Sequence, residues 1–198
     1  KLICSFFEQD INSKFISKVN DTVKFKLNQA VNLFGIQPNV ESIFALMLAD
    51  VYNTGQLEYN RGKFIKFIDD YQKTALKIKP LYYSENTKEE VLRIYETCKK
   101  QNYKMVISSN TMFLKGVTMA NIVNTLFFDE KEGCPIFDDK NFSADLGVSK
   151  PDSEMFYFKK YKNYPLFHIG NDSKTDGGCV KNNIKYIGRF GKWDYLWS

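Results

Sequence analysis

The chain has 198 residues, of which 43% are hydrophobic and 16% aromatic, and it carries a formal net charge of +5. This composition excludes a disordered polypeptide and allows one substantial core with a small attached subdomain. No apolar run reaches the roughly 18 residues of a membrane span, and the dispersed lysines are typical of solvated helix faces, so we expect a cytoplasmic protein without a membrane or nucleic-acid partner. Four scattered cysteines and a single histidine predict neither a disulfide framework nor a zinc site.

Several apolar runs of strand length are each followed by small or polar residues. These runs cover residues 2–7, 104–108, 165–169 and 184–187. The pattern is typical of parallel strands whose carboxyl ends hold a ligand. The residues between the later strands show helical periodicity, over 91–95, 117–123 and 155–161. We therefore predict an α/β fold with βαβ connections, in which helices cover both faces of a three-layer, Rossmann-like parallel sheet.

A long insertion separates the first two strands. Its roughly 75 residues exceed an ordinary crossover, so the segment must have structure of its own. Apolar residues recur at helical spacing in three stretches, with Gly35 and Pro38 between the first two and Gly62 before the third. The apolar faces of the second and third stretches are Val40, Ile43, Phe44, Met47, Leu48 and Val51, and Phe64, Ile65, Ile68, Tyr71, Ala75 and Leu76. We predict a helical bundle over residues 13–86, inserted into an α/β core formed by residues 1–12 and 87–198.

Three segments of the second half carry polar residues in a characteristic order. Residues 105–111 read Met-Val-Ile-Ser-Ser-Asn-Thr, residues 150–156 read Lys-Pro-Asp-Ser-Glu-Met-Phe, and residues 168–176 read His-Ile-Gly-Asn-Asp-Ser-Lys-Thr-Asp. In order, spacing and context they resemble the second, third and fourth motifs of the haloacid dehalogenase superfamily. Members of that family mostly hydrolyse phosphate esters through an aspartyl-phosphate intermediate with bound Mg²⁺. The inserted bundle corresponds in position to the family's cap.

The resemblance implies a role for each motif residue. Ser109, Asn110 and Lys150 would bind phosphate, because a transferring phosphoryl group needs polar N–H and O–H donors and a fixed cation, and Ser109 and Lys150 would act in catalysis. Asp172 and Asp176 would hold Mg²⁺, which prefers carboxylate oxygens. The fourth motif departs from the family in having an asparagine where the first acid usually follows glycine.

Each of these residues also has a purely structural explanation. A turn can begin at Ser109, Lys150 can be a surface lysine before a proline-started helix, and Asp172 can cap the helix that follows it. The site interpretation rests on the set and not on any single residue. A lone histidine at a strand end is more often a packed side chain than a catalyst, so we do not assign His168 to the site.

The first motif is where the sequence departs most from the family. Residues 5–12 read Ser-Phe-Phe-Glu-Gln-Asp-Ile-Asn, which puts Phe7 at the position of the nucleophilic aspartate. Phenylalanine has no lone pair for attack on phosphorus and cannot ligate a metal, so in this register the aspartyl-phosphate route is closed and we expect weak Mg²⁺ binding. A shifted register would make Asp10 the catalytic acid, but it would place two polar residues inside a buried strand.

Three hypotheses for function follow. The leading one is an impaired, regulatory pseudoenzyme that binds a phosphorylated small molecule or a protein partner without efficient turnover. The second is an active Mg²⁺-dependent phosphatase that uses Asp10, or alternatively Glu8, as the first-motif acid. The third is a protein-interaction module that uses the helical insertion as a docking surface, which a large exposed apolar area on that insertion would favour.

Overall fold

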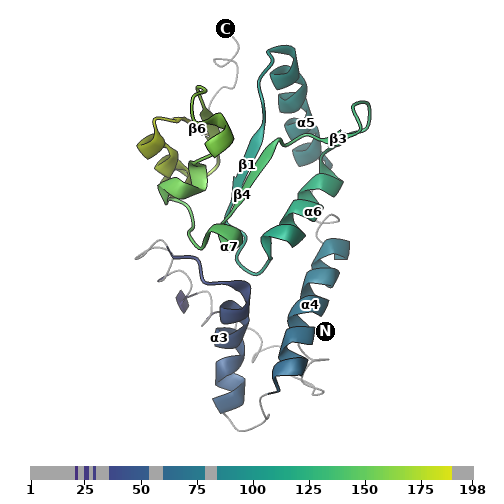
Figure 1. The fold of residues 1–198 in the computed structure, drawn as a ribbon, viewed down its shortest axis with the longest axis vertical. Coiled ribbons are helices and arrows are strands. Elements are labelled where there is room, and N and C mark those ends of the chain that lie inside the picture. The colour runs from purple at the N-terminus through teal and green to yellow at the C-terminus, as the bar shows by residue number, and fades with distance from the viewer. Residues whose placement is uncertain are drawn as a thin grey trace.

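The computed structural model describes residues 36–53, 60–78 and 84–188, together with the single residues Asp21, Phe25, Lys26 and Gln29 (Figure 1). The strand predicted for residues 2–7 and most of the helix predicted before Gly35 lie outside the described residues. Phe7 and Asp10 lie outside them as well, so the structure bears on neither register of the first motif.

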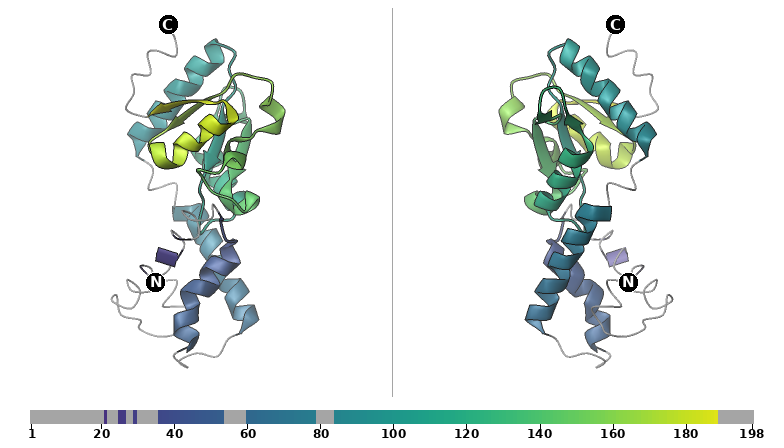
Figure 2. Two further views of the ribbon diagram at one scale, coloured as in Figure 1. Left: turned by 90° about the vertical axis from the view of Figure 1, so that its left-hand side faces the viewer. Right: turned by 90° about the vertical axis from the view of Figure 1, so that its right-hand side faces the viewer.

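Two helices of the predicted insertion lie together at one end of the molecule (Figures 1 and 2). They are α3 (Val40–Asn53) and α4 (Arg61–Ile78). The face predicted for the first of them is confirmed where the side chains are described, because Val40, Ile43, Phe44 and Leu48 are buried. Phe44 packs edge-on against the rings of Phe67 and Tyr71, at centroid distances of 5.3 and 4.9 Å.

The buried face of α4 differs in part from the prediction. Phe64, Ile68 and Ala75 are buried as expected, but Ile65 and Leu76 are 46% and 36% exposed. The reason is that α4 packs against two neighbours: Phe67 contacts α3 through Phe44, and Ala75 joins a cluster with residues of the following α/β part. Facing two neighbours turns the buried stripe away from Ile65 and Leu76.

The central part of the chain forms helices beside a parallel strand pair. Its elements are α5 (Glu85–Lys100), β1 (Val106–Ser109), α6 (Gly116–Leu126), β2 (Phe128–Asp129), β3 (Cys134–Pro135), β4 (Asp139–Phe142) and α7 (Ser143–Leu146). Strand β1 pairs in parallel with β4, with Ser109 opposite Phe142, whereas β2 and β3 form a short antiparallel hairpin. The strand predicted at 104–108 is thus confirmed with a shift of one to two residues, while β4 and the hairpin were not predicted.

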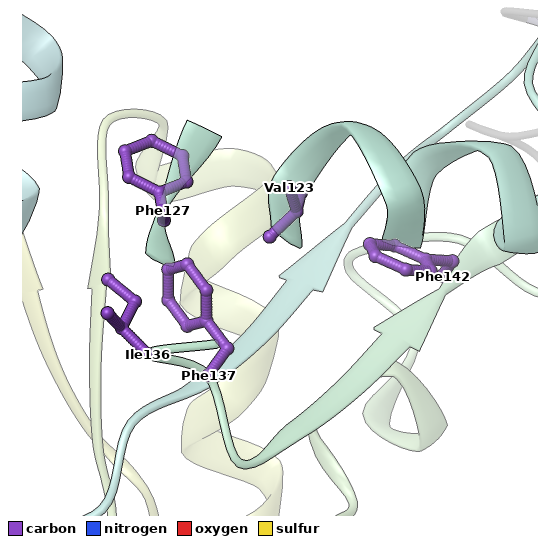
Figure 3. Close-up of a cluster of buried hydrophobic side chains, with 5 residues drawn as sticks. All are labelled: Val123, Phe127, Ile136, Phe137 and Phe142. Atoms are coloured by element: carbon purple, nitrogen blue, oxygen red, sulfur yellow. The ribbon is translucent and has the colours of Figure 1, made fainter. Parts of the chain in front are cut away.

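A hydrophobic cluster holds this part together (Figure 3). Its buried members are Val123, Phe127, Ile136, Phe137 and Phe142, from α6, the hairpin region and β4. Partly buried side chains from α5 and β1 pack against them. Apolar burial of this kind is the main favourable contribution to folding, so the cluster stabilises the packing of α6 and the hairpin region against β4.

The last described part contains a second parallel pair. Its elements are η2 (Ser153–Phe156), η3 (Lys159–Tyr161), β5 (Phe167–Gly170), α8 (Ser173–Asp176), η4 (Gly177–Asn182) and β6 (Lys185–Gly188). Strands β5 and β6 pair in parallel, which confirms the strands predicted at 165–169 and 184–187 with small shifts. The helix predicted over 155–161 is instead two short 3₁₀ helices, because Tyr157 and Phe158 have extended backbone angles between them.

The described chain is therefore a mixed α/β protein with two parallel strand pairs, β1–β4 and β5–β6. None of the helices within the described ranges is long and apolar enough to cross a membrane.

Candidate functional site

The loop after β1 holds the backbone of Lys150. Asn110 Oδ1 accepts a hydrogen bond from the Lys150 N–H at 2.8 Å, and Asn110 Nδ2 donates to the Lys150 carbonyl at 3.4 Å. These two bonds join residues 40 positions apart in the chain. The second and third motifs therefore meet at the carboxyl end of β1.

The side chain of Lys150 reaches the fourth motif. Its Nζ lies 2.6 Å from Asp176 Oδ1, and the same oxygen is 3.1 Å from His168 Nε2. The side chains of Lys150, Asp176 and His168 are only 15%, 3% and 16% exposed. The ends of β1 and β5 are thus connected through one nearly buried ion pair.

The Asp176 carboxyl is held in its charged form. Burial opposes ionisation, but hydrogen bonds from His168 and Lys150, the positive charge of Lys150 and the Asp172 N–H outweigh it, so the pKa of Asp176 lies well below its usual value. An ionised carboxylate has no proton to give, so His168 Nε2 is the donor in its contact with Asp176.

Aromatic neighbours fix the imidazole in place. The ring of His168 meets the ring of Phe156 edge-on at 4.9 Å and stacks on Tyr186 at 6.3 Å. The Tyr186 hydroxyl donates to the Gly170 carbonyl at 3.2 Å. Burial, together with the negative charges of Asp176 and Asp172, raises the pKa of Tyr186. His168 is therefore packed as the sequence suggested, but it also contacts a motif residue, which the sequence did not reveal.

Asp172 lies at the start of α8. Its Oδ1 accepts from the Lys174 N–H at 2.9 Å and its Oδ2 from the Thr175 hydroxyl at 3.2 Å. This is the helix cap foreseen as the structural explanation for Asp172. The Asp172 backbone N–H donates to Asp176 Oδ2 at 3.1 Å. The two candidate metal ligands are therefore in direct contact, through the backbone of one and the side chain of the other.

Two glycines allow the close packing behind the ion pair. A Cβ on Gly170 would overlap the Asp176 carboxylate, and one on Gly178 would overlap the carbonyl group of Pro151. Only glycine permits such approaches. Gly170 therefore allows Asp176 to lie against β5, and Gly178 allows the backbone of residues 150–151 to lie against η4.

Ser109 is the last residue of β1 and is partly buried. Its neighbour Ser108, and Ser149 next to Lys150, have buried hydroxyls without a hydrogen-bond partner among the described residues. Unsatisfied hydroxyls are costly and uncommon in folded proteins. Two of them therefore flank the predicted phosphate-binding residues.

Buried glutamines connect the inserted helices to these loops. Gln72 of α4 donates to the Phe113 carbonyl and accepts from the Lys115 N–H, both at 3.0 Å, in the loop after β1. The backbone N–H of the buried Gln37, before α3, donates to the Gly147 carbonyl at 2.9 Å, three residues before Lys150. Neither link was predicted. Gln72 lies within a helical pattern, where a glutamine usually indicates a surface position, and the Gln37 bond is made by the backbone and leaves no side-chain signal in the sequence.

Within the described ranges, no group of three His, Cys, Asp or Glu side chains is arranged to hold a metal ion. The residues that the first motif would supply lie outside those ranges, so the Mg²⁺ site stays a prediction. Comparisons of the chain with models of protein families and with curated proteins found no match.

Proposed function

We propose that the chain is a degenerate member of the haloacid dehalogenase superfamily that binds a phosphorylated small molecule without turning it over efficiently. The observation that carries this proposal is the contact chain from Asn110 to Lys150 to Asp176. It brings together residues of three separate motifs at the carboxyl ends of two strands, where α/β proteins bind ligands.

The proposal includes the three-layer, Rossmann-like sheet of that family. Strands β1 and β5 each have one described neighbour, β4 and β6, and both pairs are parallel. We propose that the strand predicted for residues 2–7 joins the two pairs into one sheet, with residues 13–86 as the cap. Support comes from the apolar character of residues 2–7 and from the ion pair that already ties the ends of β1 and β5 together.

The chemistry of the residues suits an anionic ligand. An ammonium group has three N–H donors, and among the described residues Asp176 takes one from Lys150. The remaining donors and the Ser109 hydroxyl can bind phosphate oxygens. Because the Lys150–Asp176 pair is neutral overall, we expect weak binding, with a dissociation constant on the order of 1 mM.

The absence of turnover follows from position 7. With phenylalanine at the nucleophile position, no first-motif oxygen is available there to attack phosphorus. We expect phenyl phosphate with Mg²⁺ to be hydrolysed no faster than in buffer. Isothermal calorimetry should nevertheless detect its binding, weakened roughly ten-fold or more by Lys150→Met.

The matched control for that variant is Lys159→Met, which removes an exposed lysine from η3. It should leave binding unchanged. If both variants lost the same affinity for phenyl phosphate, the binding would be a nonspecific effect of positive charge, and the proposed site would be refuted. Hydrolysis that appears only in Phe7→Asp would support the proposed register of the first motif.

The phosphatase hypothesis is separated from the leading one by the same assay. Robust hydrolysis by the wild-type chain, abolished by Asp10→Asn and by Asp172→Asn, would replace the pseudoenzyme proposal. Aryl phosphate hydrolysis untouched by Asp10→Asn would count against both hypotheses.

One observation favours the interaction module as a second candidate. On the described part of the insertion, Leu46, Ile65 and Ile78 are 39%, 46% and 40% exposed. Exposed apolar side chains at neighbouring helices can form a contact surface for another protein. If that partner is a second copy, light scattering should show a molar mass that rises with concentration and falls for Ile65→Asp. A monomer at every concentration would exclude self-association.

A further inference from the structure

Asp176 has little capacity left for a further ligand. Its Oδ1 accepts from Lys150 Nζ at 2.6 Å and from His168 Nε2 at 3.1 Å, and its Oδ2 accepts from the Asp172 N–H at 3.1 Å. A carboxylate oxygen has two lone pairs, so Oδ1 is fully used. The side chain is 3% exposed, so solvent does not compete for these positions.

Asp172 is exposed and only partly engaged, because each of its two oxygens accepts one hydrogen bond and keeps a second lone pair. Its two oxygens accept from the Lys174 N–H and the Thr175 hydroxyl in the first turn of α8. A Mg²⁺ ion needs near-octahedral oxygen ligands at about 2.1 Å and loses its own water reluctantly. A bound cation on Asp176 would also lie close to the Lys150 ammonium, and like charges in a poorly solvated place repel strongly. Asp176, the buried one of the two candidate ligands, therefore does not fit the metal that the family resemblance implies.

We infer that Asp176 is an anchor for Lys150 and His168 and not a metal ligand, so that anion binding at this edge needs no divalent cation. The inference rests on the proposed phosphate-binding function and deepens it. Lys150 is then the cationic group that meets the ligand, and the two Asn110 bonds hold its backbone in place.

His168 allows a direct test because it is the single histidine of the chain. Its Nε2 lies 3.1 Å from Asp176 Oδ1, so its imidazole NMR signals report on that oxygen. Mn²⁺ is a paramagnetic substitute for Mg²⁺ and broadens the signals of nuclei close to it. We expect Mn²⁺ added to the full chain to leave the His168 signals as sharp as an equal concentration of diamagnetic Mg²⁺ does.

Selective broadening of His168 by Mn²⁺ that disappears in Asp176→Asn or Asp172→Asn, but persists in Glu154→Gln, would overturn the inference. Glu154 is an exposed carboxylate on η2 and serves as the matched control. Since Asp176→Asn also disturbs the ion pair, Asp172→Asn provides the independent variant. The expected result requires only the wild-type chain.

The second experiment titrates inorganic phosphate into the full chain, without Mn²⁺ and at constant pH, once in buffer with EDTA and once in buffer with MgCl₂. We expect the His168 signals to shift in both buffers, with affinities that agree within about two-fold. Shifts that require MgCl₂ would overturn the inference and leave the proposed function standing. No shift in either buffer would refute phosphate binding itself, while the Mn²⁺ arm would still decide whether Asp176 holds a cation.

Discussion

Two buried aspartates, Asp129 and Asp176, are both kept ionised, yet they serve different parts of the molecule. Burial opposes the charge on Asp129, but hydrogen bonds from Tyr95, from the Glu132 and Lys131 backbone and from Lys99 lower its pKa to about 2. The pKa of Asp176 is likewise held well below its usual value, although burial opposes the charge there too. Similar electrostatics at two places therefore do not by themselves identify a functional site.

The difference lies in where the partners come from. Asp129 accepts from Tyr95 at 2.9 Å and from two N–H groups of its own turn at 3.0 and 3.2 Å, and its lysine partner Lys99 is 40% exposed. These contacts join the β2–β3 hairpin to α5. Asp176 instead binds a lysine 26 positions earlier and a histidine from β5, at a strand end with glycine neighbours. The contacts of Asp129 hold the hairpin turn in place, whereas Asp176 lies at the carboxyl end of a strand, where α/β proteins bind ligands.

Replacing Asp176 should produce the largest effect. Asp176→Asn leaves Lys150 without its charge partner, and we expect the free energy of unfolding to fall by about 3 kcal/mol, the lower end for a broken buried pair because Lys150 is 15% exposed. Asp129→Asn should cost less, since Lys99 keeps Glu132 and reaches solvent. Urea denaturation of the two variants measures the difference. A greater loss for Asp129→Asn would reverse the ranking.

A smaller effect should follow from filling the space behind the lysine. In Gly178→Ala the new methyl group would overlap the Pro151 carbonyl, which belongs to the backbone and cannot rotate away. We expect about 1–3 kcal/mol of destabilisation and weaker phosphate binding. Gly133→Ala is a useful comparison, because nothing lies near its Cβ and its cost comes only from the positive φ of 67°. If Gly178→Ala bound phosphate like the wild type, η4 would not position Lys150.

Lowering the pH should have the smallest effect of the three. At pH values higher than about 3, the free energy of unfolding should change only a little. Both carboxyls have folded-state pKa values below the ordinary 3.8, so their stabilisation is complete above that value and is lost as the pH falls toward about 2 for Asp129 and lower for Asp176. The free energy of unfolding should therefore decrease with acid in the wild type and decrease less in either Asp→Asn variant. Parallel curves for wild type and variants would contradict the lowered pKa values.

Much of this architecture could be predicted from local patterns. The apolar runs ending in polar residues located β1, β5 and β6, and the helical spacing located α3, α5 and α6, because these elements bury one clear stripe or a short apolar stretch. Strand β4 was missed since its sequence, Asp-Lys-Asn-Phe, is mostly polar and only its last residue is buried. Its strand conformation depends on pairing with β1.

The site was predictable in its members but not in their contacts. The motif order pointed to Asn110, Lys150 and Asp176, and the structure brings these three together. Spacing alone could not show that Lys150 and Asp176 form an ion pair, or that His168 binds the same carboxylate oxygen. These contacts join segments that are separate in the sequence and meet only in the folded chain. The cap at Asp172 was foreseen only as a structural alternative.

The central claim is that this edge binds phosphate without cleaving it, and phosphorus NMR of phenyl phosphate tests both halves at once. With the wild-type chain and Mg²⁺ present, we expect the ester signal to broaden, the broadening to vanish in Lys150→Met and remain in Lys159→Met, and no orthophosphate signal to appear beyond the buffer rate. An orthophosphate signal that grows with wild-type protein, or an ester signal that the protein never broadens, would contradict the account.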